Sequence, residues 1–316
     1  MRIAKCAGGH FFDAEQYEAC PHCGILEEPE AKDVPVARAL EKHLVTVELF
    51  EEPRAPRVPV KAIAGVSLNI GKRSSQQDAA KIARRSFSDR EAVLGVVCDG
   101  IGGSEGGAIA STLTVDVLLD HFTKLADDDM QAFLFQEIHQ LDEQIAALKN
   151  DDEEPLRAGT TLVVAVVYES ELYWVSVGDS RAYILREGEL AQITTDHNYG
   201  MILQSKVEKG LVSEEVLRDH SEREKLISYI GYGGLRYIDQ NGRPMPLLPG
   251  DAILLCSDGI YKTLTDDLLA KFLEVELPAQ EIAEGLIKAV KSMKKEHQDN
   301  MSAVVIQIRA QEEKPG

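Results

Sequence analysis

Two apolar stretches of this chain stop at the same dipeptide, Asp-Gly. Residues 93–102 read VLGVVCDGIG, and residues 252–259 read AILLCSDG. Short apolar runs bounded by turn residues predict buried β-strands, so each aspartate is expected at the end of a strand. Neither stretch has the lysine that a phosphate-binding P-loop requires. A suitable fold must therefore explain why Asp99 and Asp258 both follow buried strands.

The hydrophobic periodicity changes in blocks along the chain. Helical spacing is found over 106–125, 130–149, 266–274 and 278–295. Strand patterns are found over 62–70, 92–98, 161–168, 172–177, 181–185, 190–193, 252–256 and 303–309. Residues 196–245 are polar and irregular, with one short helix expected over 213–218. Because strands and helices do not alternate strictly, the pattern favours an α+β sandwich over a doubly wound parallel sheet.

Acidic residues outnumber basic ones. The 53 Asp and Glu residues against 34 Lys and Arg give a net charge of −19. Such a surface repels nucleic acid and anionic membranes, so neither is an expected partner. Apolar runs such as 162–168 are too short to span a bilayer, and residues 1–5 lead into no apolar signal-peptide core. We therefore expect a soluble, cytoplasmic protein.

Composition also divides the chain along its length. We expect a compact Cys/His unit over 1–25 and a linker rich in proline and charge over 26–59. One large domain is expected over 60–310, followed by a tail over 311–316. The irregular segment 196–240 is long for a compact domain, which is typical of segments with a functional role such as substrate choice.

The cysteines of the first unit indicate a metal site rather than a disulfide framework. The chain has 5 cysteines, and Cys6, Cys20 and Cys23 lie near His10 in the sequence. Three thiolates and one imidazole favour a closed, structural zinc site. His22 could replace His10, and the alternative is a set of incidental reduced cysteines. The unit resembles the small zinc-ribbon knuckles found at the start of some bacterial signalling proteins, with a role in docking or local folding.

Acidic residues beside glycine, or at expected strand ends, recur along the large domain. They are Asp78, Asp99, Asp179, Asp258 and Asp299. Carboxylates that converge at one sheet edge repel one another unless a cation lies between them. Oxygen-only ligands favour magnesium or manganese, and two such ions bridged by one carboxylate can activate a water for attack on phosphorus. The alternative for any single Asp-Gly is an ordinary turn, which we favour for Asp179.

Several motifs come in a fixed order along this domain. They are Arg73-x4-Asp78, GVVCDGIGGSEGGAIAS over 95–111, AGTT over 158–161, VGDSRAY over 177–183, TTDHN over 194–198, LLCSDG over 254–259 and DNMSAVV over 299–305. In this order they resemble the metal-dependent serine/threonine protein phosphatases of type 2C, in their bacterial form. The resemblance implies a four-layer αββα fold, in which two packed antiparallel β-sheets are flanked by α-helices.

The resemblance also implies a ligand set for two manganese or magnesium ions. Asp99 would bridge both ions, and Gly100 would give its backbone carbonyl to the second. Asp258 and Asp299 would complete the ligands of the first ion. Asp78 would bind a metal or its water shell from the first strand. Because the nucleophile would be a hydroxide between the metals, no phosphoenzyme is expected.

Three further residues are expected beside these ligands. Arg73 resembles the arginine that clamps the substrate phosphate, a task that suits its planar guanidinium. Gln77 stands where some family members have an acidic residue, and it could still hold a water. Asn300 is expected to support Asp299 from outside the ligand set.

Two other positions depart from the family pattern. Ile101 stands where eukaryotic members have a histidine proposed as the general acid. Leu156 lies where an aspartate for a third, weaker metal is often found, and the nearest acidic residues are at 151–154. Either one of these substitutes or the third site is absent. We favour absence, because Pro155 opposes a simple shift of register.

The sequence therefore predicts a metal-dependent phosphoserine/phosphothreonine protein phosphatase. Its partners would be phosphorylated proteins and a cognate bacterial serine/threonine kinase. The alternative is a catalytically weak, phosphatase-like module that binds phosphoproteins. A module of this kind would be expected to lose one of Asp99, Asp258 or Asp299, and all three are present.

Overall fold

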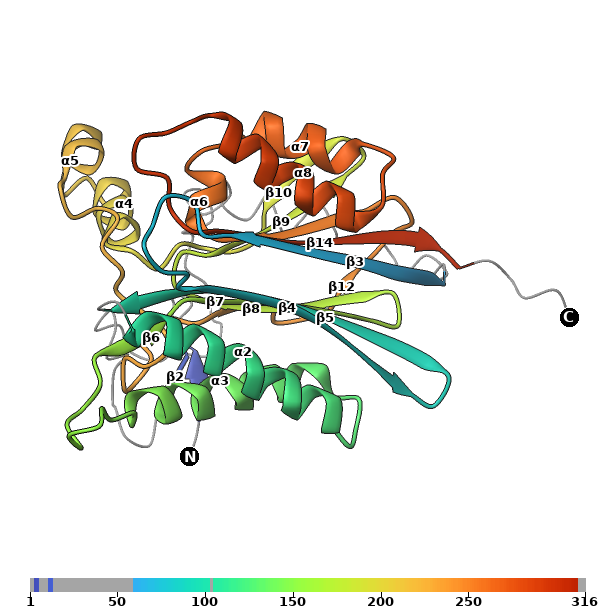
Figure 1. The fold of residues 1–316 in the computed structure, drawn as a ribbon, viewed down its shortest axis with the longest axis horizontal. Helices are drawn as coiled ribbons and strands as arrows, with labels where there is room; N and C mark the ends of the chain where they lie inside the picture. The colour runs from blue at the N-terminus through green and yellow to red at the C-terminus, as the bar shows by residue number, and fades with distance from the viewer. Residues whose placement is uncertain (1–2, 6–10, 14–58, 103–104, 312–316) are drawn as a thin grey trace, which may run out of the picture. The chain divides into compact units, whose positions relative to one another are not determined.

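The computed structural model describes residues 3–5, 11–13, 59–102 and 105–311 (Figure 1). The chain divides into two compact units, Met1–Pro53 and Arg54–Gly316. In the first unit, β1 (Ile3–Lys5) pairs antiparallel with β2 (Phe11–Asp13). The predicted zinc ligands Cys6, His10, Cys20 and Cys23 lie outside the described residues, as does the predicted linker up to residue 58.

Two antiparallel sheets form the centre of the second unit. The five-stranded sheet has the order β10-β9-β13-β14-β3, and the seven-stranded sheet has the order β11-β8-β7-β5-β4, with β12 on β8 and β6 on β5. The first sheet contains β3 (Val60–Asn69), β9 (Arg181–Arg186), β10 (Glu189–Gln192), β13 (Ala252–Cys256) and β14 (Met301–Ala310). The second contains β4 (Asp78–Phe87), β5 (Arg90–Gly102), β6 (Ala158–Thr160), β7 (Leu162–Tyr168), β8 (Glu171–Val177), β11 (Asp239–Gln240) and β12 (Met245–Pro246).

Helices cover the outer face of each sheet. α2 (Gly106–Lys124) and α3 (Met130–Ala146) pack on the seven-stranded sheet, and α7 (Asp266–Glu274) and α8 (Ala279–Ser292) pack on the five-stranded one (Figure 1). The predicted αββα arrangement of two antiparallel sheets between helical layers is therefore confirmed.

Both faces of strand β5 are buried, which explains why most of its residues are apolar. Successive side chains of a strand point to opposite faces of the sheet. Leu94, Val96 and Cys98 enter the core beneath α2 and α3, whereas Val93 and Val97 enter the core between the two sheets. Because both faces of β5 are covered, the run has no alternation of polar and apolar residues.

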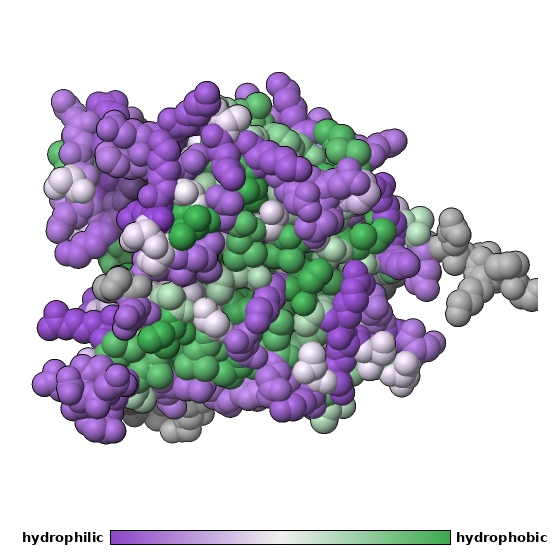
Figure 2. Space-filling view, in the orientation of Figure 1, coloured by the Kyte–Doolittle hydropathy of each residue, from purple (hydrophilic) through white to green (hydrophobic). Residues whose placement is uncertain are grey.

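One segment extends beyond the layered body. α4 (Tyr199–Glu208) and α5 (Glu214–Asp219) pack against each other at the left of Figure 1. Only Leu203 of α4 is buried, no residue of α5 is, and hydrophilic side chains cover most of this region in Figure 2. We call residues 196–240 the flap.

The sequence pattern missed some of these elements. Strand β4 and helix α4 were not expected, nor was the short helix α6 (Asp258–Tyr261). Across the described residues, no helix combines the length and the apolar character needed to cross a membrane.

Candidate metal centre

The carboxylates expected from the sequence meet at one edge of the two sheets. Strands β4 and β5 pair so that Asp78 lies directly opposite Asp99. In the other sheet, β13 and β14 are neighbours, with Asp258 just after β13 and Asp299 just before β14. The sheets pack face to face, which brings strand ends far apart in the sequence to one site.

A cleft of about 300 Å³ lies at this edge. Its lining includes most of the predicted site residues, namely Arg73, Gln77, Asp99, Gly100, Asp258, Asp299 and Asn300. Ile101 and Asp179 also line it. Residues 151–154, the nearest acids to the predicted third metal position, are exposed on the turn after α3 and do not line this cleft.

Asp78 is buried beneath the cleft. Its Oδ2 accepts hydrogen bonds from the hydroxyls of Ser257 and Ser302, each at 2.7 Å. Its Oδ1 is buried and has no hydrogen-bond partner. Burial raises the pKa of Asp78 to about 7, partly offset by the two hydroxyls and reinforced by the charges of Asp258 and Asp299.

Asp99 is the centre of the acidic group. Burial, followed by the charges of Asp78, Asp258, Asp179 and Asp299, raises the pKa of its carboxyl well above the ordinary range. Its backbone is fixed by the AGTT motif, because Asp99 N–H donates to the Thr161 hydroxyl at 2.9 Å and its carbonyl accepts from Thr161 N–H at 2.8 Å.

The glycine of each Asp-Gly pair is required by close packing. A Cβ on Gly100 would lie 2.3 Å from the carbonyl oxygen of Gly107, and one on Gly259 would lie 2.0 Å from that of Asn300. Real Cβ atoms do not approach backbone oxygens so closely, so neither position accepts a side chain. The repeated dipeptide therefore reflects two crowded strand ends.

Asp299 and Asp258 each face a cation. Arg73 Nη2 lies 2.6 Å from Asp299 Oδ2, and Lys262 Nζ lies 2.9 Å from Asp258 Oδ2. Burial alone would lower the pKa of Lys262, but the neighbouring carboxylates, Asp258 foremost, raise it above its ordinary value. The second oxygen of Asp258, Oδ1, is buried without a partner.

Asn300 connects the last strand to the loop that carries Arg73. Its backbone N–H donates to Asp299 Oδ1 at 2.8 Å, while its side-chain amide donates to the carbonyls of Ile70 and Ser75. Its side-chain oxygen accepts from Gln77 N–H at 2.7 Å. The Gln77 carbonyl in turn accepts from the backbone N–H of Gly100 at 3.1 Å. Asn300 thus holds the whole loop against the cleft.

Sequence reasoning missed several residues of this site. Ser257 and Ser302 hold Asp78, Lys262 and Glu224 line the cleft, and Asp179, expected as a turn residue, is buried in its wall. Burial and the charge of Asp258 raise the pKa of Asp179 to about 7. Its place between a glycine and an expected strand already grouped Asp179 with the candidate acids in the sequence, although a turn was the favoured interpretation.

The donor set fits hard cations. Within the described ranges, no group of three or more Cys, His, Asp or Glu side chains is arranged to hold a metal ion, and Arg73 and Lys262 each pair with one cleft carboxylate. The chemistry of the group suits a cation, because burial and mutual repulsion raise the pKa values of Asp78 and Asp99 and two buried carboxylate oxygens have no hydrogen-bond partner. All side-chain donors are oxygen atoms, which suits manganese or magnesium.

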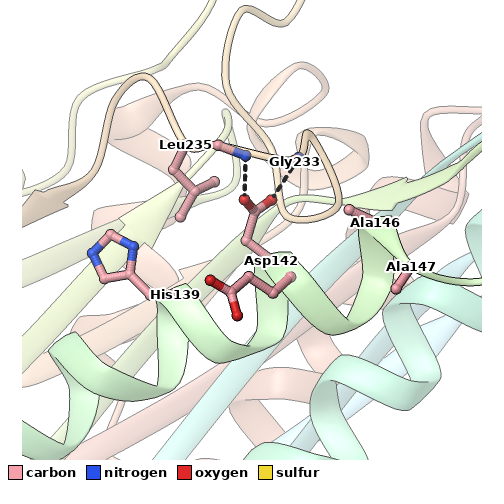
Figure 3. A pocket seen from close by; sticks show the side chains of 8 residues that line it. His139, Asp142, Ala146, Ala147, Gly233 and Leu235 are labelled. Atoms are coloured by element: carbon pink, nitrogen blue, oxygen red, sulfur yellow. Dashed lines mark hydrogen bonds between the residues drawn. The ribbon is translucent and has the colours of Figure 1, made fainter.

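A larger pocket lies elsewhere, between α3 and residues 233–235. It measures about 480 Å³ and is lined by His139, Asp142, Glu143, Ala146, Ala147, Gly233, Gly234 and Leu235 (Figure 3). Asp142 is 3% exposed, and its carboxylate accepts the backbone N–H groups of Gly231, Gly233 and Gly234. This carboxylate is fully engaged in fixing the end of the flap.

Comparison with known proteins identifies the family. Residues 68–293 match protein phosphatase 2C. The serine/threonine phosphatase stp of Listeria welshimeri serovar 6b is 28% identical over 216 residues, covering 67% of this chain and 83% of that protein. The serine/threonine protein phosphatase PstP of Mycobacterium tuberculosis H37Rv is 28% identical over 214 residues, covering 67% of this chain and 40% of that protein.

Solved structures agree with this match. The catalytic domain of serine/threonine protein phosphatase PstP in complex with 2 manganese ions superposes with a TM-score of 0.62 at 26% identity, covering 79% of this chain and 99% of that one. The S. agalactiae serine/threonine phosphatase shares the fold, with a TM-score of 0.68 at 24% identity over 78% of this chain. With more than half of its length matched and the acidic cleft in place, this chain belongs to the protein phosphatase 2C family.

Proposed function

We propose that this chain hydrolyses phosphoserine and phosphothreonine esters of proteins at a site for two manganese or magnesium ions. The observation that carries this proposal is the convergence of buried and half-buried carboxylates around Asp99, with buried, unpartnered oxygens on Asp78 and Asp258. Support comes from relatives named as serine/threonine phosphatases and from the PstP structure with 2 manganese ions.

Each predicted site residue then has a task. Asp99 and the Gly100 carbonyl would hold the ions at the centre of the site. Asp258 and Asp299 would complete the ligand set, while Asp78 would bind a metal or its water shell. Bound ions of this kind supply an activated water and stabilise charge on the phosphoryl oxygens.

The chain's own cations and hydrogen bonds prepare the substrate side of the cleft. Arg73 is 61% exposed at its side chain and is held to the site only through Asp299 and its loop. When Asp299 serves as a metal ligand, the Arg73 guanidinium is free to make a bidentate contact with the phosphate. Asn300 fixes the loop of Arg73, so it positions this contact rather than touching the substrate.

The test is hydrolysis of para-nitrophenyl phosphate and of a phosphothreonine peptide by the full chain, with and without manganese. We expect turnover that requires manganese and ceases with a chelator. A folded protein without manganese-dependent turnover would overturn the proposal. Since Asp99, Asp258 and Asp299 all line the cleft, no observation favours the alternative of a non-catalytic binding module.

Further parts of the proposal concern partners and the first unit. We propose a cytoplasmic signalling role opposite a serine/threonine kinase of the same cell, testable by phosphoproteomics of a strain that lacks this protein. A structural zinc ion held by Cys6, His10, Cys20 and Cys23 is also proposed. The pairing of Lys5 with Phe11 supports it, because these are the sequence neighbours of Cys6 and His10. Zinc that is lost in a Cys20→Ser/Cys23→Ser variant is the expected result of metal analysis.

A further inference from the structure

The two basic residues that line the cleft share one arrangement. Arg73 is paired with Asp299, and Lys262 is paired with Asp258. Both carboxylates belong to the proposed metal site. A carboxylate that gives its charge to a metal ion holds a neighbouring ammonium less strongly. Ion binding would therefore release both basic side chains toward the space where a phosphate enters.

Lys262 differs from Arg73 in having a second partner. Its Nζ lies 3.1 Å from Oε2 of Glu224, a flap residue that also lines the cleft. Lys262 is the C-cap residue of α6, the short helix that begins at Asp258. One ammonium thus connects the proposed metal site to the flap.

The flap side of this contact is fixed in place. Residues 223–227 run beside residues 197–200, where the N–H groups of Tyr199 and Gly200 donate to the carbonyls of Lys225 and Arg223. At its far end, the flap is fixed by Asp142 (Figure 3). The backbone on either side of Glu224 is thus held next to Lys262, while the Glu224 side chain itself is 55% exposed.

We propose that Lys262 is a second cationic contact for the substrate phosphate, opposite Arg73, and that Glu224 of the flap competes with the phosphate for it. This inference rests on the proposed phosphatase function and adds a residue to its substrate site. A phosphate dianion between a guanidinium and an ammonium is a charge-assisted arrangement stronger than either contact alone. The flap would then set the affinity for phosphate by holding or releasing one side chain.

The proposal predicts effects of opposite sign at the two residues. Lys262→Met removes the contact and should weaken phosphate binding about tenfold, whereas Glu224→Gln releases the ammonium and should strengthen it about threefold. In the double variant, phosphate affinity should equal that of Lys262→Met, since Glu224 acts only through Lys262. Lys262→Arg keeps the charge and should retain most of the affinity.

The experiment uses the full chain saturated with manganese. Inorganic phosphate is titrated by calorimetry and also measured as a competitive inhibitor of para-nitrophenyl phosphate hydrolysis. Manganese affinity is measured in parallel and should not fall in Lys262→Met, because Asp258 loses a competitor. Lys225→Met is the matched control, since Lys225 is the flap residue next to Glu224, but it pairs with Glu222 and does not line the cleft.

Three results would overturn the proposal. Unchanged phosphate affinity in Lys262→Met would show that Lys262 does not contact the phosphate. Weaker binding in both Lys262→Met and Glu224→Gln would mean that Lys262 only holds the flap. Loss of manganese in Lys262→Met would make it a support of the metal site. A wild-type protein without turnover would instead refute the phosphatase function, while the calorimetric phosphate titration would still test Lys262.

Discussion

Asp142 and the cleft aspartates Asp78 and Asp179 are buried carboxylates, and Asp99, Asp258 and Asp299 are half-buried, yet the surroundings of Asp142 and of the cleft are opposite. Asp142 accepts three backbone N–H groups, with its closest contact of 2.7 Å to Gly234 (Figure 3). Asp78 and Asp258 each keep one buried oxygen without a partner, and Asp99 faces the charges of four other aspartates. Burial alone therefore does not separate a structural carboxylate from a functional one.

The difference lies in what compensates the charge. The oxygens of Asp142 accept three backbone N–H groups, so its hydrogen-bonding capacity is met within the protein. The cleft carboxylates are brought together by strands that have no other reason to end there, and their repulsion is left for a cation to relieve. The larger pocket of Figure 3 is therefore lined by a carboxylate with its hydrogen bonds made, and the smaller cleft by carboxylates that repel one another.

Replacing the central aspartate gives the largest expected effect. Asp99→Asn should lower manganese-dependent turnover by more than about a hundredfold, the upper end of losses seen for groups that only support a metal ligand. Without metal, the same change should raise the free energy of unfolding, because it removes a charge that four neighbours repel. Kinetics with para-nitrophenyl phosphate and urea denaturation measure the two effects, and retained turnover would refute the assignment of Asp99.

The pH dependence of stability that arises from the cleft carboxylates should have opposite signs without and with manganese. The pKa values of Asp78 and Asp179 are raised to about 7, so the metal-free folded state binds protons that the unfolded state has already lost. The stability they contribute is present below about pH 4 and is lost as pH rises through about 7. Manganese should reverse this trend and release protons on binding near neutral pH.

Denaturation between pH 5 and 8 with and without manganese tests that expectation, together with calorimetry in buffers of different ionisation enthalpy. Asp142→Asn serves as the control, since the pH trend should persist in it. A proton release of zero near neutral pH would contradict the acidic cluster as the binding site.

Replacing Asp142 should lower the stability of the fold rather than change the manganese-dependent activity. Asp142→Ala leaves three N–H donors of the 231–234 loop without their acceptor and should lower the free energy of unfolding by about 3 kcal/mol. Well below its unfolding midpoint, the variant should keep its requirement for manganese. A loss of manganese binding with an unchanged free energy of unfolding would contradict the structural role of Asp142.

A buried base near the cleft gives the smallest effect, with the opposite sign to the acids. His197 is buried, its Nδ1 accepts from Gly178 N–H at 3.1 Å, and burial lowers its pKa to about 4. Its stability contribution is present above about pH 6.5 and is lost as pH falls toward 4. Between about pH 7.5 and 5.5 the loss should be about 1 kcal/mol.

The comparison of wild type with His197→Gln isolates this contribution, because the acidic groups are the same in both proteins. Their difference in unfolding free energy should shrink as the pH falls. A difference that stays constant over this range would show that the imidazole does not titrate with folding.

Much of the fold was predictable because the buried strands are strongly apolar. Strand β4 was missed because it lies at the edge of its sheet and carries Lys81, Arg84 and Arg85, and edge strands tolerate charge. Helix α4 was missed because it buries only Leu203, so it has no clear apolar stripe.

The site was predictable where a residue adjoins a strand and a glycine, as Asp99 and Asp258 do. The serines that hold Asp78 were not, since Ser257 and Ser302 are 45 residues apart and meet only when β13 pairs with β14. The role of Lys262 could not be predicted either, because it depends on the ion pair with Glu224 of the flap. Pairings between distant segments carry no local pattern.

The pairing of β3 with β14 has a consequence for how the protein is made. Among the described residues of the second unit these are the first and last strands, and they are matched along ten residues, from Val60–Ala310 to Asn69–Met301. A chain still emerging from the ribosome has neither the partner of β3 nor the Asp299 and Asn300 that precede β14. The acidic cleft can therefore be completed only after β14 has been synthesised, so a translation product truncated before β14 should lack phosphatase activity.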